Sequence, residues 1–241
     1  MRKRLHYGIM YTNLIGRTDF MAIELVVFDL DGTLIASLEG IQYSMNKILN
    51  EHSLSPHSLE EYRLFVGKGL KNLVFQSLPD NKRSDEDIDY FYKIMMETYD
   101  SNYDKYMRLY DGVAELLDYL VDNNYKIAVN TNKNHYITQK IAKAYLNDWP
   151  FTAIIGSDFG FEKKPDPAAA IHIARQAGVD LKRCLYVGDT GVDIQTAQNA
   201  GMTPVSVTWG FRKKQELEPF NPPYWIDNPS ELINVIKSLE H

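Results

Sequence analysis

The sequence is poor in cysteine and in long apolar runs, and each shortage excludes a class of protein. Its 241 residues include one cysteine, Cys184, so the chain can form neither an internal disulfide nor a zinc site built on cysteine spacing. Its apolar runs, such as residues 25–28, are a handful of residues long, far short of a membrane span. We therefore expect a cytoplasmic protein with no membrane partner.

Basic residues are also in the minority. Lysine and arginine total 26 against 32 aspartates and glutamates, which gives a formal net charge of −6. A protein built to coat nucleic acid carries a strong basic excess, so we expect no nucleic-acid partner. Hydrophobic residues make up 44% of the chain, enough for a sizeable core, and the length fits one large or two unequal domains.

Residues 1–20 differ from the rest of the chain. They hold four basic residues and one acid, Asp19, without the continuous apolar stretch of a secretory signal. A transit peptide is the minor alternative. We expect a poorly ordered N-terminal extension that the protein does not need, since Met21 directly precedes the first strand pattern.

From Met21 onward, short apolar runs alternate with amphipathic segments. The pattern predicts strands at residues 23–28, 126–130, 153–156, 184–187 and 204–207, and helices at 113–121, 136–146, 167–177 and 192–200. Strands that alternate with helices are typical of an α/β fold, here a Rossmann-like, doubly wound parallel sheet.

One long stretch breaks this alternation. Residues 38–107 show helical periodicity and no strand pattern, with breaks near residues 55–56, 67–69 and 79–84. We predict that this stretch is an inserted α-helical cap domain of three to four helices. The α/β core would then comprise residues 21–37 and 108–241.

Four polar motifs stand at strand–helix junctions of the predicted core. They are Asp29–Thr33, Thr131–Lys133, Lys163–Pro167 and Gly188–Asp193. In open parallel sheets, ligands bind beyond the carboxyl ends of the strands. If the predicted fold is right, all four motifs converge at one edge of the sheet.

The first and last motifs supply carboxylates. Asp29 and Asp31 are two residues apart at a strand end and face the same side, and Asp189 and Asp193 lie at the start of a helix. Taken alone, each pair also fits a capped turn or a helix N-cap. Four clustered carboxylates repel one another, and a hard cation with oxygen ligands resolves this, so we predict a Mg²⁺ site.

The middle motifs supply phosphate-binding groups. Thr131 and Asn132 offer a hydroxyl, an amide and backbone N–H groups before a helix, which suits a phosphate, although a simple N-cap is the alternative. Lys164 precedes a proline, so it stands outside the next helix and can reach a site as a point charge. The alternative for Lys164 is a solvated surface lysine.

Taken together, these motifs resemble those of the haloacid dehalogenase superfamily, and within it the phosphoglycolate phosphatase group. The resemblance covers nearly everything from Met21 onward. The segments that support the resemblance are Asp29–Thr33, Thr131–Lys133, Lys164–Pro167, residues 187–201 and Thr208–Arg212. The helical insert after the first motif is similar to the small cap of that group.

The resemblance implies a role for each motif. Asp29 would be the nucleophile that forms an aspartyl-phosphate, and Asp31 would donate a proton to the leaving oxygen and then activate water. Thr131 and Asn132 would hold the phosphoryl oxygens, and Lys164 would neutralise the nucleophile and the phosphoryl group.

The resemblance also implies a magnesium site. Asp29, the main-chain carbonyl of Asp31 and Asp189 would bind Mg²⁺, with Asp193 supporting the metal shell. The implied activity is hydrolysis of a small phosphorylated metabolite by a monomer or homodimer. A sugar phosphomutase, a pyrophosphatase or nucleotide phosphatase, and a catalytically silent binding module remain as alternatives.

Selectivity is expected to lie in the insert. Lys68, in the Val66–Leu70 loop, is a candidate to pair with a substrate carboxylate, while an exposed lysine in a helix–helix turn is the alternative. Ala36–Ser37 stands where many members of the group have an Asp-Ser pair. This departure concerns the identity of the substrate and leaves the chemistry unchanged.

Overall fold

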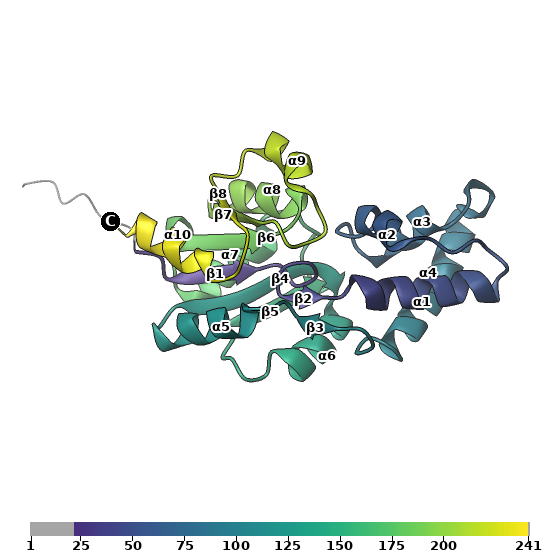
Figure 1. Cartoon of the computed structure of the whole chain (residues 1–241), viewed down its shortest axis with the longest axis horizontal. Coiled ribbons are helices and arrows are strands. Elements are labelled where there is room, and N and C mark those ends of the chain that lie inside the picture. Colours follow the sequence, from purple (N-terminus) through teal and green to yellow (C-terminus); the bar gives the residue numbers. More distant parts are fainter. Residues whose placement is uncertain (1–21, 241) are drawn as a thin grey trace, which may run out of the picture.

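Within the part of the chain that the structure describes, six parallel strands form the central sheet, in the spatial order β5-β4-β1-β6-β7-β8 (Figure 1). The computed structural model describes residues 22–240. The predicted extension at residues 1–20 lies outside the described residues. The strands are β1 (Leu25–Phe28), β4 (Lys126–Asn134), β5 (Ala153–Ser157), β6 (Cys184–Gly188), β7 (Thr203–Val207) and β8 (Tyr224–Ile226). The parallel pairing confirms the predicted α/β class.

Helices cover both faces of this sheet because strand residues alternate between the faces. Leu25 and Val27 of β1 belong to the apolar cluster that includes α7 (Ala168–Ala177) and α8 (Gly191–Ala200). Val26 and Phe28 belong to the cluster on the other face. The helices of that face are α5 (Val113–Asp122), α6 (His135–Tyr145) and α10 (Glu231–Leu239).

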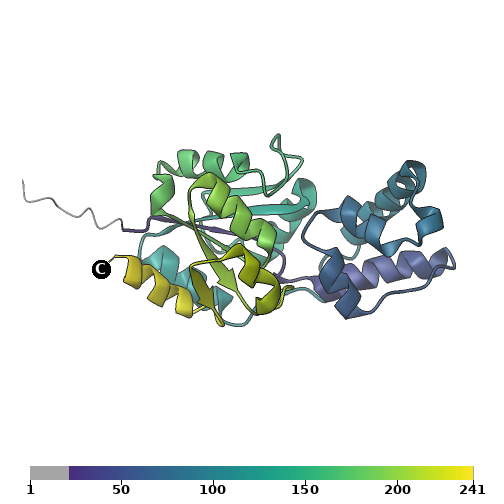
Figure 2. The same ribbon diagram turned by 90° about the horizontal axis from the view of Figure 1, so that it is seen from above.

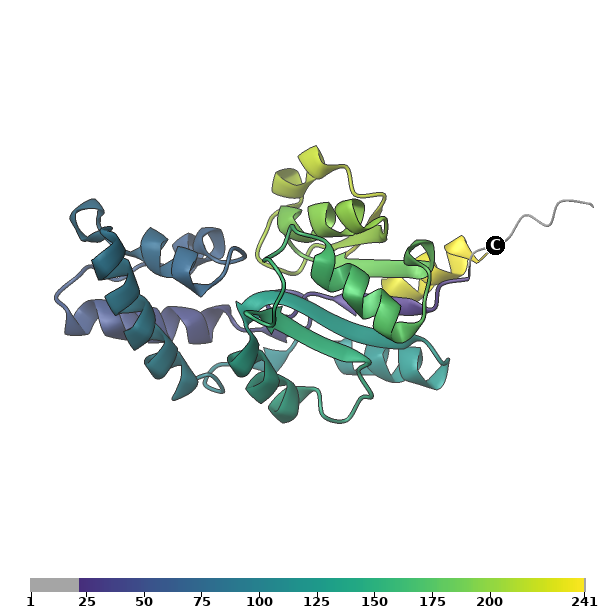
Figure 3. The same ribbon diagram turned by 180° about the vertical axis from the view of Figure 1, so that it is seen from behind.

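The helical insert joins the core through two short antiparallel strands. β2 (Ile35–Ala36) leads into it, and β3 (Arg108–Leu109) leads back. Between them lie α1 (Leu38–Glu51), α2 (Leu59–Phe65), α3 (Leu70–Ser77), the 3₁₀ turn η1 (Asp80–Lys82) and α4 (Asp85–Asp100). Figures 2 and 3 show the insert at one end of the core, opposite α10. The predicted breaks separate these helices.

Local capping explains where the insert helices begin. Ser58 and Glu61 form a reciprocal capping box at the start of α2, and the Ser84 side chain accepts the Asp87 N–H at the start of α4. Such caps satisfy N–H groups that have no partner within the helix. Within residues 22–240, no helix is long and apolar enough to cross a membrane.

The structure corrects one boundary and adds elements that the sequence did not predict. Strand β4 runs on to Asn134, past the expected end at Asn130, because its pairing with β5 resumes at Asn134 after an irregularity. Thr131 and Asn132 therefore lie on an irregular strand extension and not in the turn before α6. The elements not predicted are β2, η1, β3, β8, α10, η2 (Leu181–Arg183), α9 (Lys214–Leu217) and η3 (Glu218–Phe220).

Candidate active site

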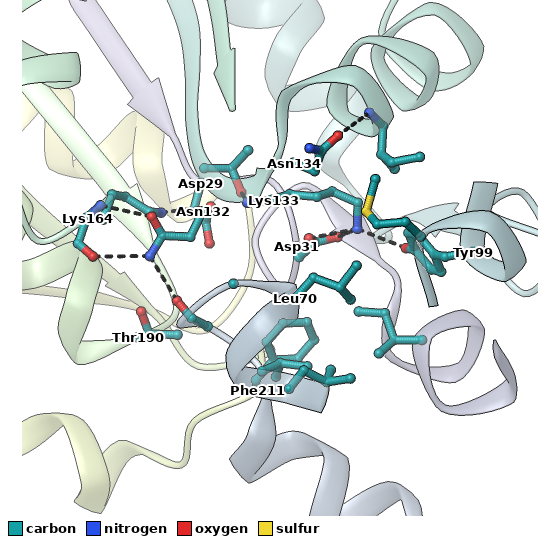
Figure 4. A pocket seen from close by; sticks show the side chains of 18 residues that line it. Asp29, Asp31, Leu70, Tyr99, Asn132, Lys133, Asn134, Lys164, Thr190 and Phe211 are labelled. Carbon is teal, nitrogen blue, oxygen red and sulfur yellow. Dashed lines mark hydrogen bonds and ion pairs between the residues drawn. The ribbon is translucent and has the colours of Figure 1, made fainter. Parts of the chain in front are cut away.

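The four motifs meet in one pocket between the carboxyl ends of the strands and the insert (Figure 4). Asp29 directly follows β1, and its N–H donates to Val187 of β6 at 2.9 Å, so pairing between neighbouring strands sets its position. Of the predicted site residues, those lining the pocket are Asp29, Asp31, Thr131, Asn132 and Lys164. The two remaining aspartates, Asp189 and Asp193, are buried and do not line the pocket.

Lys164 is the charged centre of this cluster. Its Nζ lies 2.9 Å from Asp29 Oδ1 and 2.6 Å from Asp193 Oδ1, with only 3% of its side chain exposed. Burial alone lowers the pKa of a lysine, but Asp193 and Asp29 outweigh this and raise the pKa of Lys164 well above its ordinary value. Lys164 therefore carries a fixed positive charge, and the surface alternative for it is wrong.

Asn132 holds the backbone of Lys164 at both ends. Its Oδ1 accepts the Lys164 N–H at 2.8 Å, and its Nδ2 donates to the Lys164 carbonyl at 3.1 Å. Nδ2 also donates at 3.1 Å to the carbonyl of Gly67 in the insert. The Asn132 amide thus positions Lys164. The nearby Thr131 hydroxyl accepts the Lys133 N–H at 3.2 Å and remains at the pocket wall.

Helix α8 fixes Asp193. Thr190 and Asp193 form a capping box, in which Asp193 Oδ2 accepts from the N–H and hydroxyl of Thr190 at 3.0 and 2.6 Å. The other oxygen, Oδ1, contacts Lys164. Asp193 is therefore both the first-turn acid of the simpler interpretation and a member of the charged cluster, whereas the helix N-cap is Thr190 and not an aspartate.

Asp189 is enclosed by backbone. Its Oδ2 accepts the Phe211 N–H at 2.7 Å, and its Oδ1 lies 3.5 Å from the Thr33 hydroxyl. A Cβ atom on Gly32 would lie 2.4 Å from Asp189 Oδ2, and one on Gly210 would lie 2.3 Å from Asp189 Cβ. Two glycines are thus required where the chain approaches this carboxylate most closely.

The carboxylates fit a divalent cation. Asp29, Asp189 and Asp193 each offer an oxygen within 4.8 Å of the others. Although Lys164 lies at ion-pair distance, Asp29 Oδ1 is buried and accepts no hydrogen bond of proper geometry. The ion pair with Lys164 at 2.9 Å compensates this buried oxygen in part, and a second cation would compensate it further. Oxygen donors of this kind suit a hard ion such as Mg²⁺.

The raised pKa values of these carboxyl groups are a second feature that a cation would offset. Burial raises the pKa of Asp29 to about 6, because the attraction of Lys164 only partly offsets burial and the repulsion of Asp193 and Asp31. Burial, followed by Asp193 and Asp29, raises the pKa of Asp189 well above its ordinary value. A bound cation would favour the ionised form of both groups.

The structure reveals a contact at Asp31 that the sequence did not predict. Lys133 Nζ donates to both carboxylate oxygens of Asp31 at 3.0 Å and to the hydroxyl of Tyr99 at 2.8 Å (Figure 4). Tyr99 belongs to α4 of the insert and is 2% exposed. Burial alone lowers the pKa of Lys133, but Asp31 and Tyr99 raise it above its ordinary value.

The insert contributes mainly apolar side chains to the pocket. They are Ile41, Val66, Leu70, Leu73 and Met96. Gly67 and Gly69 of the 66–70 loop also line it, whereas Lys68 between them is exposed and is not among the lining residues. A role for Lys68 in substrate recognition remains a prediction.

Comparisons with known proteins agree with this architecture. A sequence model for haloacid dehalogenase-like hydrolases matches residues 26–207. A phosphoglycolate phosphatase of Pseudomonas savastanoi pv. phaseolicola is 32% identical over 215 residues, covering 87% of this chain and 78% of its own. A phosphoglycolate phosphatase of Aquifex aeolicus is 29% identical, covering 89% of this chain and 97% of its own.

Solved structures show the same fold. A predicted phosphoglycolate phosphatase from Haemophilus somnus 129PT superimposes with a TM-score of 0.82 at 28% identity, covering 88% of this chain and 97% of its own. A haloacid dehalogenase-like family hydrolase from Streptococcus pneumoniae gives 0.78 at 25% identity, covering 88% and 98%. The chain belongs to the haloacid dehalogenase-like hydrolases.

Proposed function

We propose that this protein is a Mg²⁺-dependent phosphatase that hydrolyses a small phosphate monoester through an aspartyl-phosphate on Asp29. One observation carries the proposal: the Lys164 ammonium lies between Asp29 and Asp193, beside the buried Asp189. A phosphate ester brings about two negative charges to a site that is already acidic, so it can approach Asp29 only where fixed positive charge is present.

Each residue has a task in the first half-reaction. Asp29 attacks phosphorus, the bond from phosphorus to the ester oxygen breaks, and Asp31 gives its proton to the departing oxygen. Lys164 neutralises the charge on the phosphoryl oxygens, and Thr131 lies at the pocket wall to donate to them. Asp29, the Asp31 carbonyl, Asp189 and Asp193 would hold Mg²⁺, which supplies further compensation for this charge.

The second half-reaction returns the enzyme to its starting state. Asp31, now ionised, takes a proton from water as the water oxygen bonds to phosphorus and the bond from phosphorus to Asp29 breaks. The products are inorganic phosphate and the free Asp29 carboxylate. The apolar side chains of the insert keep other water away while the first step proceeds.

The relatives support a phosphoglycolate-like substrate. The curated relatives in Pseudomonas savastanoi and Aquifex aeolicus carry the name phosphoglycolate phosphatase. We propose the same class of small, acidic monoester here, with Lys68 near its carboxylate after movement of the 66–70 loop. A cytoplasmic location and a monomeric or homodimeric state complete the proposal.

The test is phosphate release from a panel of esters with Mg²⁺ and with EDTA, beside Asp29→Asn. The panel contains phosphoglycolate, sugar phosphates, nucleoside monophosphates and pyrophosphate. We expect metal-dependent release that falls by at least about 10³-fold in Asp29→Asn. No release from any ester by the wild-type protein would overturn the proposal. Transfer of phosphate between sugar positions without release would identify a mutase instead.

A further inference from the structure

Lys133 is the residue of the Thr131–Lys133 motif to which the proposed mechanism gives no task. Its side chain enters the pocket from the irregular end of β4 and is 8% exposed, and the Asp31 side chain beside it is 16% exposed. Few water molecules can compete for either group. The orientation of Asp31 therefore depends on the protein groups around it.

The contacts of Lys133 fix that orientation. An ammonium has three N–H donors, and here two of them reach the two oxygens of Asp31 while the third reaches the Tyr99 hydroxyl. Because both oxygens lie 3.0 Å from one ammonium, Lys133 restrains the position of the Asp31 carboxylate. The third contact, to the Tyr99 hydroxyl, restrains the ammonium itself.

Tyr99 connects this arrangement to the insert. It belongs to α4, whereas Asp31 and Lys133 belong to the core, so the three side chains form a bridge across the boundary. Figure 4 shows Lys133 and Tyr99 on the insert side of Asp31, with Asp29 and Lys164 toward the core. The bridge exists only while α4 lies against the core.

We propose that Lys133 is the positioning residue of Asp31, which it holds toward the reacting atoms when Tyr99 of the seated insert completes the bridge. This inference rests on the proposed phosphatase function. Lys133 need not touch the substrate, since it acts through Asp31. Both half-reactions depend on it. The ionised carboxylate that takes a proton from water accepts both Lys133 contacts, and the acid that gives a proton keeps the contact at its carbonyl oxygen.

A phosphate ester that needs no proton on its leaving group separates these two tasks. p-Nitrophenolate leaves as a stable anion, so its first half-reaction does not require Asp31, whereas the second still does. Lys133→Met removes the charge and keeps the length of the side chain. With p-nitrophenyl phosphate, this variant should release a burst of nitrophenolate equal to the enzyme concentration, followed by slow turnover.

Steady-state kinetics provide the second readout. We expect Lys133→Met to lower kcat about tenfold or more for both phosphoglycolate and p-nitrophenyl phosphate. KM for phosphoglycolate should change by less than about threefold, whereas KM for p-nitrophenyl phosphate should fall together with kcat, because its first half-reaction is intact. Lys133→Arg should restore part of kcat, and Tyr99→Phe should lower it about fivefold. Lys126→Met, at the opposite end of the same strand, is the matched control and should behave as the wild type.

The outcomes separate this inference from the proposed function. Unchanged kcat in Lys133→Met, or a kcat loss that lacks both the burst and rescue by arginine, overturns it. A rise in KM for phosphoglycolate alone, with normal kcat, overturns it in favour of direct substrate binding by Lys133. Should Lys133→Met fail to fold, Tyr99→Phe with unchanged kcat overturns it. A wild-type protein that releases no phosphate from any ester overturns the proposed function itself.

Discussion

Arg212 of the core donates a hydrogen bond to the backbone oxygen of Arg63 in helix α2, and Arg63 donates in return to the backbone oxygen of Phe211 at 3.1 Å. Arg212 also donates to the carbonyl of Val66, at the pocket wall, at 2.8 Å. The N–H of Phe211 holds Asp189. These reciprocal hydrogen bonds join the insert to the loop that positions Asp189, a candidate metal ligand.

Loss of the hydrogen bonds between Arg212 and the end of helix α2 should lower kcat/KM more than it lowers the stability of the fold. Arg212→Met removes the charged donors that hold the end of α2 against the core, and such bonds contribute about 1.5–3 kcal/mol each when shielded from water. Because Arg212 is partly exposed, we expect less, with kcat/KM lowered about tenfold. Enzyme kinetics and trypsin sensitivity of the insert measure the effect.

Arg83→Met is the matched control for Arg212→Met. Arg83 also donates to backbone oxygens, those of Phe75 and Leu78, but entirely within the insert. The control should keep kcat/KM near that of the wild type. Equal losses of kcat/KM in the two variants would show that the contact between the insert and the core has no specific role in catalysis.

Magnesium affinity should depend on pH. The pKa of Asp29 is raised from 3.8 to about 6 in the metal-free protein, chiefly by burial, so below pH 6 the ion must displace a proton. We expect the affinity to fall by about tenfold for each pH unit below 6, and more steeply where Asp189, whose pKa is also raised, takes up a proton. Calorimetric titration from pH 5 to 8 measures this, and an affinity that does not change with pH contradicts it.

Removal of the central lysine should destabilise the protein in a pH-dependent way. Lys164→Met leaves Asp29, Asp189 and Asp193 buried without their cation, and breaking a buried ion pair costs about 3–5 kcal/mol. Some carboxyl groups have a higher pKa in the native state than in the unfolded state, and such a group destabilises the native protein. The destabilisation is complete at pH values above the native pKa and becomes smaller as the pH falls through that pKa.

In the wild-type protein that interval runs from about 6 down to 3.8 for Asp29, and removal of Lys164 raises its upper end. Urea unfolding of metal-free Lys164→Met should therefore show the larger loss at pH 8 and a smaller loss at pH 5. Added Mg²⁺ should recover part of it. A loss of stability that is equal at both pH values contradicts the charge explanation.

A methyl group at Gly210 should damage the metal site. The added Cβ would lie 2.3 Å from Asp189 Cβ and 2.5 Å from the Gly32 carbonyl, so Asp189 or the backbone must move. We expect Gly210→Ala to weaken Mg²⁺ binding by about tenfold or more, as disruption of a ligand's support typically does.

Gly160→Ala serves as its control. Gly160 has a φ of +90° but no heavy atom within 4 Å of an added Cβ, so this variant tests backbone strain without a collision. Calorimetric Mg²⁺ binding should be normal in it. Normal binding in Gly210→Ala would mean that Asp189 does not bind the metal.

The convergence of Asp29, Asp189 and Lys164 could be predicted from the sequence. Short apolar runs separated by amphipathic helices indicate a parallel sheet, and the carboxyl ends of such strands lie at one edge. The extent of α8 was also predicted to within one residue, although its N-cap is Thr190 and not an aspartate. The end of β4 was predicted wrongly because strand pairing with β5, and not local composition, extends it.

The roles of Lys133 and Tyr99 could not be predicted in this way. They are 34 residues apart, and nothing in the local pattern of either shows that α4 returns to the end of β4. The hydrogen bonds between Arg63 and Arg212 likewise join residues that are 149 positions apart in the sequence. The orientation of the Asn132 amide toward the Lys164 backbone could not be predicted either. An amide offers the same donor and acceptor in any surroundings, so packing decides which groups it contacts.

The sequence by itself therefore determined the class of fold and the chemical groups of the site, because hydrophobic periodicity and strand-end motifs are local properties. The tertiary structure decided how those groups are used. Packing of the insert on the core buries Asp29 and Lys164 together, brings Tyr99 to Lys133, and exposes Lys68 while its neighbouring glycines line the pocket. Burial and distance set the charge state and orientation of a side chain, and both arise only when distant segments pack.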